Sequence, residues 1–266
     1  MKKIFYAFIL ILLCFPMAAQ NFVPIQADLE MTPSPDIDYL KEGVFAYQNN
    51  NFQQALDYFL IVENNGLKNP TLYFNIGNAY YRNNQIANAI IYYKKALLLD
   101  SSFKPAQNNL EFMLSITQDK QTDLEEHAMT KFVVNHYYFF SINTLMVICF
   151  ILLFVIIVLI HIQWFFRDKD NTAIRFINFI VLFIFICCSG ITISRIYIAN
   201  NNNEAVVTDG TVYVYSGPSE SFTRLFTLHE GTVLKIQKEE LNWTQVSTLS
   251  GFSGWIDAGT YRKIRE

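Results

Sequence analysis

Charged residues are scarce in this sequence. Asp, Glu, Lys and Arg make up 16 % of the 266 residues, against about 25 % in a typical soluble domain. The net charge is −3 and the chain has no basic block, which argues against a nucleic-acid partner. Hydrophobic residues reach 52 % and are concentrated in a few segments. This uneven distribution predicts a multidomain membrane protein rather than a single soluble unit.

Cysteine is also rare, and every cysteine lies in a strongly apolar segment: Cys14, Cys149, Cys187 and Cys188. Without a CxxC motif or a Cys/His cluster, the sequence predicts no zinc site. It also lacks a Ser/His/Asp set, an HExxH motif and the glycine-rich loops of nucleotide-binding enzymes. We therefore expect a non-enzymatic protein with no catalytic residue, no cofactor and no metal.

The N-terminal residues have the pattern of an export signal. Lys2 and Lys3 precede an uncharged run over residues 4–15, which is followed by Pro16 and a pair of alanines. The run is shorter than the roughly 20 residues that a membrane span needs, so residues 1–19 are predicted to be a signal peptide and residues 20–35 a linker. Two alternatives are a lipoprotein signal that uses Cys14 and an uncleaved anchor.

Residues 36–120 carry an internal repeat with a period of 34 positions. The period relates Gly43 to Gly77, and it also relates Tyr39 to Tyr73, Phe52 to Ile86, Ala55 to Ala89, and Phe59 to Tyr93. A constant period over two helix-sized blocks predicts stacked helix pairs. Asparagines suit the turns between the helices, because Asn tolerates left-handed backbone angles. Two ordinary amphipathic hairpins are the alternative. Residues 105–115 begin a third block, which we interpret as a capping helix.

The second block resembles the tetratricopeptide consensus at Tyr73, Ile76, Gly77, Tyr80, Ala89, Tyr93 and Ala96. Repeats of this family bind peptides on their concave face. The resemblance places the following residues on that face: Leu40, Val44, Tyr47, Phe74, Asn78, Tyr81 and Arg82. A packing role is the alternative for each of them. Because Leu40 and Phe74 occupy positions where the family's carboxylate clamp has lysine, we expect an apolar or aromatic groove.

Two long uncharged segments predict a transmembrane hairpin. The expected parts are a helix over 141–163, a loop over 164–175 and a second helix over 176–198. Each helix is long enough to cross the roughly 30 Å hydrocarbon core of a bilayer. Arg167, Lys169 and Arg175 lie in the loop, so the positive-inside rule predicts a cytoplasmic loop and two periplasmic soluble domains at the inner membrane.

After a linker of four asparagines, residues 204–266 alternate between apolar and polar positions in short runs: 205–207, 212–215, 225–228, 233–237, 243–246 and 254–256. Turn signals separate the runs, which predicts a small all-β barrel. The stretch resembles a bacterial SH3-like domain at Val212, Ser216, Gly217, Pro218, Gly231, Trp243, Gly254 and Trp255. Tyr215 stands where similar domains carry arginine. His229 and Glu230 precede a turn glycine, and we interpret them as a solvated hairpin end.

The order of these segments resembles that of BatE-type proteins of the Bacteroides aerotolerance (Bat) family. The resemblance implies an envelope complex with companion proteins that bear von Willebrand A-type domains, and a link to oxygen or stress tolerance. We therefore interpret the chain as a membrane-anchored scaffold for protein partners. One alternative is a cell-wall module whose SH3-like domain binds peptidoglycan. Another is a stress sensor that signals through the hairpin.

Overall fold

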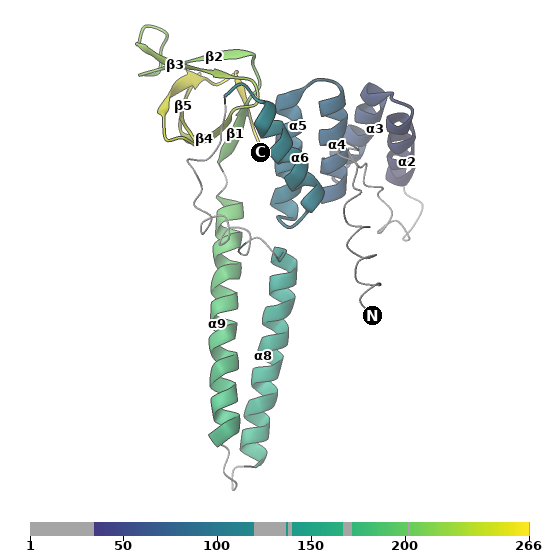
Figure 1. The fold of residues 1–266 in the computed structure, drawn as a ribbon, viewed down its shortest axis with the longest axis vertical. Coiled ribbons are helices and arrows are strands. Elements are labelled where there is room, and N and C mark those ends of the chain that lie inside the picture. Colours follow the sequence, from purple (N-terminus) through teal and green to yellow (C-terminus); the bar gives the residue numbers. More distant parts are fainter. Residues whose placement is uncertain (1–34, 120–136, 138–139, 167–171, 202, 266) are drawn as a thin grey trace, which may run out of the picture.

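The computed structural model describes residues 35–119, 137, 140–166, 172–201 and 203–265. The expected signal peptide, nearly all of the linker at 20–35 and loop residues 167–171 lie outside these ranges. Within them the chain forms an α-helical repeat domain, two long apolar helices and an antiparallel β-domain (Figure 1). This arrangement confirms the predicted fold class.

Between residues 35 and 119, which we call the repeat domain, the chain forms the helices α2 (Pro35–Gln48), α3 (Phe52–Asn64), α4 (Pro70–Arg82), α5 (Ile86–Leu99) and α6 (Lys104–Ile116). They are arranged side by side, from α2 at the outer end to α6 near the β-domain (Figure 1). Asn50 and Asn84 lie in the turns of the first two helix pairs, with φ of 61° and 59°. These positive angles confirm the prediction that asparagine makes the tight turns.

Local sequence signals explain where α4 begins. The side chain of Asn69 accepts a hydrogen bond from the backbone N–H of Thr71 at 2.8 Å. Pro70 follows as the first helical residue, where its missing N–H costs nothing. The cap and the proline together set the start of the helix that carries most of the tetratricopeptide signature.

Two glycines allow the helices of each pair to approach closely. A Cβ atom at Gly77 would lie 2.7 Å from the Tyr93 ring, and one at Gly43 would lie 2.6 Å from the Phe59 ring. Both rings are fully buried. The glycines are therefore required for packing, although glycine costs about 1 kcal/mol relative to alanine in a helix.

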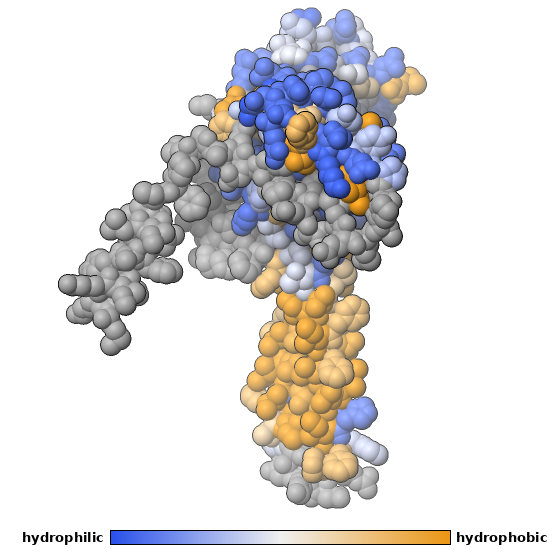
Figure 2. Space-filling view, turned by 90° about the vertical axis from the view of Figure 1, so that its right-hand side faces the viewer, coloured by the Kyte–Doolittle hydropathy of each residue, from blue (hydrophilic) through white to orange (hydrophobic). Residues whose placement is uncertain are grey.

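Helices α8 (Ile142–Phe165) and α9 (Thr172–Asn200) form a hairpin, and both soluble domains lie at the same end of it (Figure 1). By length and composition both helices could cross a membrane. Their side chains point mostly outward, with Phe150 73 % exposed and Phe183 62 % exposed. Figure 2 shows that this apolar surface extends along the hairpin, whereas hydrophilic residues dominate the described surface of the soluble end. An apolar surface of this extent is suited to lipid rather than water.

Residues 203–265, which we call the β-domain, form the strands β1 (Glu204–Val207), β2 (Thr211–Tyr215), β3 (Arg224–His229), β4 (Val233–Glu240), β5 (Trp243–Thr248), β6 (Ser253–Asp257) and β7 (Tyr261–Lys263). Their order in the sheet is β3-β2-β6-β5-β4-β1-β7, and every pair is antiparallel. The predicted runs correspond to β1 through β6. The sequence analysis misses β7, because its three residues are too few to show an alternating pattern. Val212, Val214, Leu228, Val246 and Ile256 lie in the core.

The packing of Gly77 generates a first prediction. Gly77→Leu should destabilise the repeat domain by about 1–3 kcal/mol, because the new side chain meets the buried Tyr93 ring and forces the helices apart. For a folded unit of about 150 residues, which is the size of the two soluble domains together, the loss corresponds to a fall in melting temperature of about 2–4 °C per kcal/mol. Thermal unfolding of the detergent-solubilised protein measures it.

Gly210→Leu is the matched control, since a Cβ atom at Gly210 would have nothing within 4 Å. This variant should unfold close to the parent temperature. Equal melting temperatures for the two variants would contradict the helix register described above.

Candidate functional site

The structure places four of the seven predicted peptide-binding residues in the interior. Leu40, Tyr47, Phe74 and Asn78 are all more than nine-tenths buried. The Phe74 ring packs 5.6 Å from the ring of Phe103. The Oδ1 atom of Asn78 accepts hydrogen bonds from the Tyr93 hydroxyl at 2.7 Å and from the Nδ2 of Asn109 at 2.9 Å. These four side chains hold neighbouring helices together, so little of their surface is left for a peptide.

The other three predicted residues reach the surface. Val44 and Tyr81 are partly buried and Arg82 is exposed. The guanidinium of Arg82 lies 4.2 Å from the centre of the Phe52 ring, which holds it against α3. The Tyr81 ring makes an edge contact with Phe112 of α6, with centroids 6.1 Å apart. The predicted site therefore continues onto α6.

Sequence reasoning missed two residues on α6. Phe112 is 46 % exposed and Ile116 is 48 % exposed, and they lie one helical turn apart on the same side of α6. The repeat period identifies them, because they follow Asn78 and Arg82 by 34 positions. The sequence alone predicts a capping helix here, and its match to the 34-residue period is confined to a few positions near the start of the helix. We call Val44, Tyr81, Arg82, Phe112 and Ile116 the repeat face.

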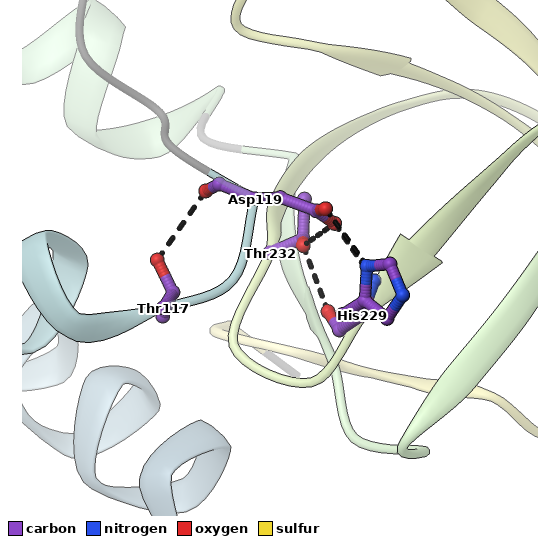
Figure 3. A network of polar contacts seen from close by, with 4 residues as sticks. All are labelled: Thr117, Asp119, His229 and Thr232. Atoms are coloured by element: carbon purple, nitrogen blue, oxygen red, sulfur yellow. Dashed lines mark hydrogen bonds and ion pairs between the residues drawn. The ribbon is translucent and has the colours of Figure 1, made fainter.

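A polar network joins the repeat domain to the β-domain (Figure 3). Asp119 follows α6, and its carboxylate accepts hydrogen bonds from the backbone N–H of His229 at 2.7 Å and from the Thr232 hydroxyl at 2.7 Å. The Nδ1 atom of His229 lies 2.8 Å from the same carboxylate, which places the proton of the ring on Nδ1. One carboxylate thus holds the turn between β3 and β4.

The electrostatics of Asp119 favour its charged form. Burial of the carboxyl group alone would raise its pKa. The hydrogen bonds from Thr232 and His229 outweigh this effect, so the pKa of Asp119 lies below its ordinary value. The Asp119 carboxylate is therefore ionised at neutral pH and can accept all of these hydrogen bonds.

Further polar contacts surround the network. The carboxylate of Glu230 accepts a hydrogen bond from the backbone N–H of Ala87 at 3.1 Å, in the first turn of α5, where unpaired N–H groups attract anions. Lys94 and Glu204 form an ion pair at 2.8 Å that is largely shielded from solvent. The interpretation of His229 and Glu230 as a solvated hairpin end is wrong, because both bind the repeat domain.

Apolar contacts extend the junction into a shared core. Val206, Val233 and Ile264 of the β-domain are fully buried and belong to the same hydrophobic cluster as the repeat helices. Gly231 sits between the domains with φ of +88°, and a Cβ atom there would lie 2.7 Å from Thr117. Only glycine combines this backbone angle with so close an approach. The two soluble domains therefore pack as one body, which we call the head.

The β-domain carries an aromatic cluster on the side of β2 away from its core. The Tyr215 ring is buried against Trp243, with the rings edge to face and centroids 5.5 Å apart. Arg224 pairs with Tyr215 across the β2–β3 ladder, and its guanidinium lies 4.1 Å from the centre of the Tyr213 ring and 5.8 Å from that of Tyr215. Position 215, where similar domains carry arginine, is a tyrosine. In the structure, Arg224 of β3 lies opposite Tyr215, so an arginine is present beside this position. The pairing of β2 with β3 is needed to see this, because the two residues are not adjacent in the sequence.

Comparison with known families gives one match in each soluble domain. A tetratricopeptide repeat matches residues 70–103 and a bacterial SH3 domain matches residues 210–261. Comparison with curated proteins gives no match. A tetratricopeptide repeat indicates protein–protein interaction, and a bacterial SH3 domain suggests a peptidoglycan-binding module. Both are typically non-catalytic.

Among the residues that the structure describes, no group of three His, Cys, Asp or Glu side chains could hold a metal ion.

The Asp119 network generates a second prediction. Asp119→Asn replaces one acceptor oxygen by an N–H₂ donor that faces other donors, and should weaken the junction by about 1–3 kcal/mol. Hydrogen–deuterium exchange at residues 229–233 should rise in the variant. Asp209→Asn is the matched control, because Asp209 lies exposed on the β1–β2 turn.

The effect should depend on pH. Because the folded-state pKa of Asp119 is lowered, its contribution is fully present above the ordinary value of 3.8 and is lost as the pH falls through the lowered pKa. Parent and variant should therefore differ at pH 7 and converge in acid below about pH 4. A difference that persists unchanged at pH 2 would contradict this account.

Proposed function

We propose that this protein is a non-enzymatic, membrane-anchored scaffold that binds protein partners in an envelope complex. The observation that carries the proposal is the shared core between the repeat domain and the β-domain, at one end of a hairpin suited to the membrane. Two interaction modules are thereby held at a constant distance from each other. A partner complex that contacts both gains avidity without the entropy cost of ordering a linker.

The order of the modules supports a place in the Bacteroides aerotolerance family, as a BatE-type protein. On this proposal the partners are envelope proteins with von Willebrand A-type domains, and the complex contributes to aerotolerance or stress resistance. A tetratricopeptide repeat beside a bacterial SH3 domain and two apolar helices is consistent with this assignment.

The repeat face is the proposed binding surface for a protein partner. Tyr81, Phe112 and Ile116 offer aromatic and apolar contacts, which supply most of the affinity in peptide recognition. Arg82 adds a positive charge at the rim. Leu40, Tyr47, Phe74 and Asn78 support this surface from beneath through the packing described above. We therefore propose an extended or helical segment with apolar anchors and an acidic flank as the ligand.

The third prediction tests the repeat face. Tyr81→Ala combined with Phe112→Ala in the full-length protein should release the envelope partners, because both anchors are removed while the buried residues remain. Affinity purification from detergent-solubilised membranes with partner identification measures the loss. Phe45→Ala is the control, since Phe45 is also an exposed aromatic residue of the repeat domain but lies outside the repeat face.

Peptidoglycan binding by the β-domain is the second candidate function. The bacterial SH3 match and the cluster of Arg224, Tyr213, Tyr215 and Trp243 favour it. If the full-length protein sediments with purified peptidoglycan, Arg224→Ala abolishes the sedimentation, and the Tyr81/Phe112 variant keeps all its partners, then wall binding replaces the scaffold proposal.

The fourth prediction concerns orientation. Both soluble domains are proposed to be periplasmic, because the positive charges around Lys169 favour a cytoplasmic loop. In a chain whose native cysteines are replaced by serine, Lys41→Cys should react with a membrane-impermeant maleimide added to the periplasmic side. Lys169→Cys should react only after the inner membrane is broken. The reverse labelling pattern would place the head in the cytoplasm.

A further inference from the structure

A pocket lies where the repeat domain, the β-domain and the end of α9 meet. Its volume is about 760 Å³, and it is lined by residues of α3, α4 and α5, by the last residues of α9 and by the C-terminal end of the chain after β6. It is separate from the repeat face and from the aromatic cluster of the β-domain. The three parts of the molecule each contribute to its wall.

Positive charge dominates this pocket. Lys68, Lys95, Arg262 and Arg265 line it, whereas Glu63 is the one carboxylate among its lining residues. Glu63 is already engaged, because it pairs with Lys95 at 3.1 Å and accepts a hydrogen bond from the Tyr92 hydroxyl at 2.6 Å. An excess of three positive charges therefore faces the space, which suits an anionic group and disfavours an ammonium group.

The arginines keep their charge available. Arg262 donates to the neutral side chain of Asn88 at 3.4 Å. Arg265 donates to the backbone carbonyl of Ala199 at 2.8 Å and to the side chain of Asn200 at 3.3 Å. These contacts orient both guanidinium groups without neutralising them, which leaves their remaining N–H groups for an oxyanion.

Aromatic side chains form the floor of the pocket. Tyr80 and Tyr92 stack with ring centroids 5.3 Å apart, and the Nζ atom of Lys95 lies 4.5 Å from the centre of the Tyr92 ring. Burial, together with the hydrogen bond to Glu63, raises the pKa of Tyr92, so this hydroxyl stays protonated at neutral pH. Above these buried rings, Leu60, Leu98 and Leu99 line the pocket and reach its surface, where they can pack against glycerol and ester carbons.

The pocket lies at the level of lipid headgroups. The uncharged stretch of α9 ends before Arg195, and the pocket residues Ala199 and Asn200 follow about one helical turn later, roughly 6–8 Å along the axis. The polar layer of a bilayer leaflet has a similar thickness, roughly 5–8 Å. Arg195 is buried and contacts the Phe140 carbonyl and the Ser101 hydroxyl, so the α5–α6 turn of the repeat domain is held at the same level.

We propose that this pocket binds the phosphate of an anionic phospholipid from the leaflet that faces the head. Lys68, Arg262 and Arg265 contact the phosphate oxygens, and the leucines of the lining pack against the glycerol region. A zwitterionic lipid is disfavoured, because its ammonium group finds no unpaired carboxylate among the lining residues that the structure describes. The bound lipid bridges the repeat domain, the β-domain and α9. The inference requires membrane insertion and is independent of what the repeat face binds.

The test uses the full-length protein in nanodiscs that contain phosphatidylcholine with a minor fraction of phosphatidylglycerol. Native mass spectrometry of the released protein should show one retained phosphatidylglycerol in preference to phosphatidylcholine. Lys68→Gln combined with Arg265→Gln should reduce this retention by about thirtyfold, the combined loss expected for two cations near a lipid phosphate. Both side chains are exposed, so the protein should still fold.

Lys41→Gln combined with Lys235→Gln is the matched control, because it removes two exposed charges away from the pocket and should leave retention unchanged. Equal retention of both lipids by the parent protein, or an equal loss in the control, overturns the proposal. Adding inorganic phosphate distinguishes the source of the anion. If millimolar phosphate displaces the retained lipid, the pocket is a site for soluble phosphate and the lipid assignment fails.

Discussion

The turn between β3 and β4 packs against α5 and the residues after α6, and this contact joins the two soluble domains. Gly231 brings the turn backbone against Thr117 and Ile90, while Asp119 holds the same turn through three contacts. At this turn the polar groups are hydrogen-bonded and the apolar side chains are packed against each other. The relative position of the repeat face, the aromatic cluster and the membrane helices depends on it, because the β-domain follows α9 directly in the chain.

The contact also explains how so short a repeat array can be stable. About three repeats are needed before stacked helix pairs bury a continuous core, and here the described array ends with α6, the first helix of a third block. Val206, Val233 and Ile264 cover apolar surface of the repeat helices in the shared cluster. The β-domain therefore protects the array from one side, as a further repeat would do in a longer solenoid.

Sequence periodicity predicted the elements of this structure because each element follows a local rule. The 34-residue period identified the repeats, uncharged length identified the hairpin, and alternation identified six of the strands. The junction could not be predicted, since Asp119 and His229 are 110 positions apart and neither belongs to a motif. The same limit applies to the peptide-binding residues. The repeat period predicted binding roles for Phe74 and Asn78, but their burial depends on contacts with Phe103, at the end of the same repeat, and with Asn109 of the following block.

The shared core has a consequence for how partners can bind. When two binding modules are joined by a flexible linker, the linker lets the second module reach its site on partners of many different shapes, and the second binding event gains from a raised effective concentration. Here the repeat face and the aromatic cluster of the β-domain belong to one body at one end of the apolar hairpin, so a partner that contacts both must match a single spacing. Partners with another spacing bind one module only and lose the avidity. On the scaffold proposal, such a head selects its complex by geometry as well as by side-chain chemistry, and loosening the Asp119 network should reduce that selection before it reduces binding to either module alone.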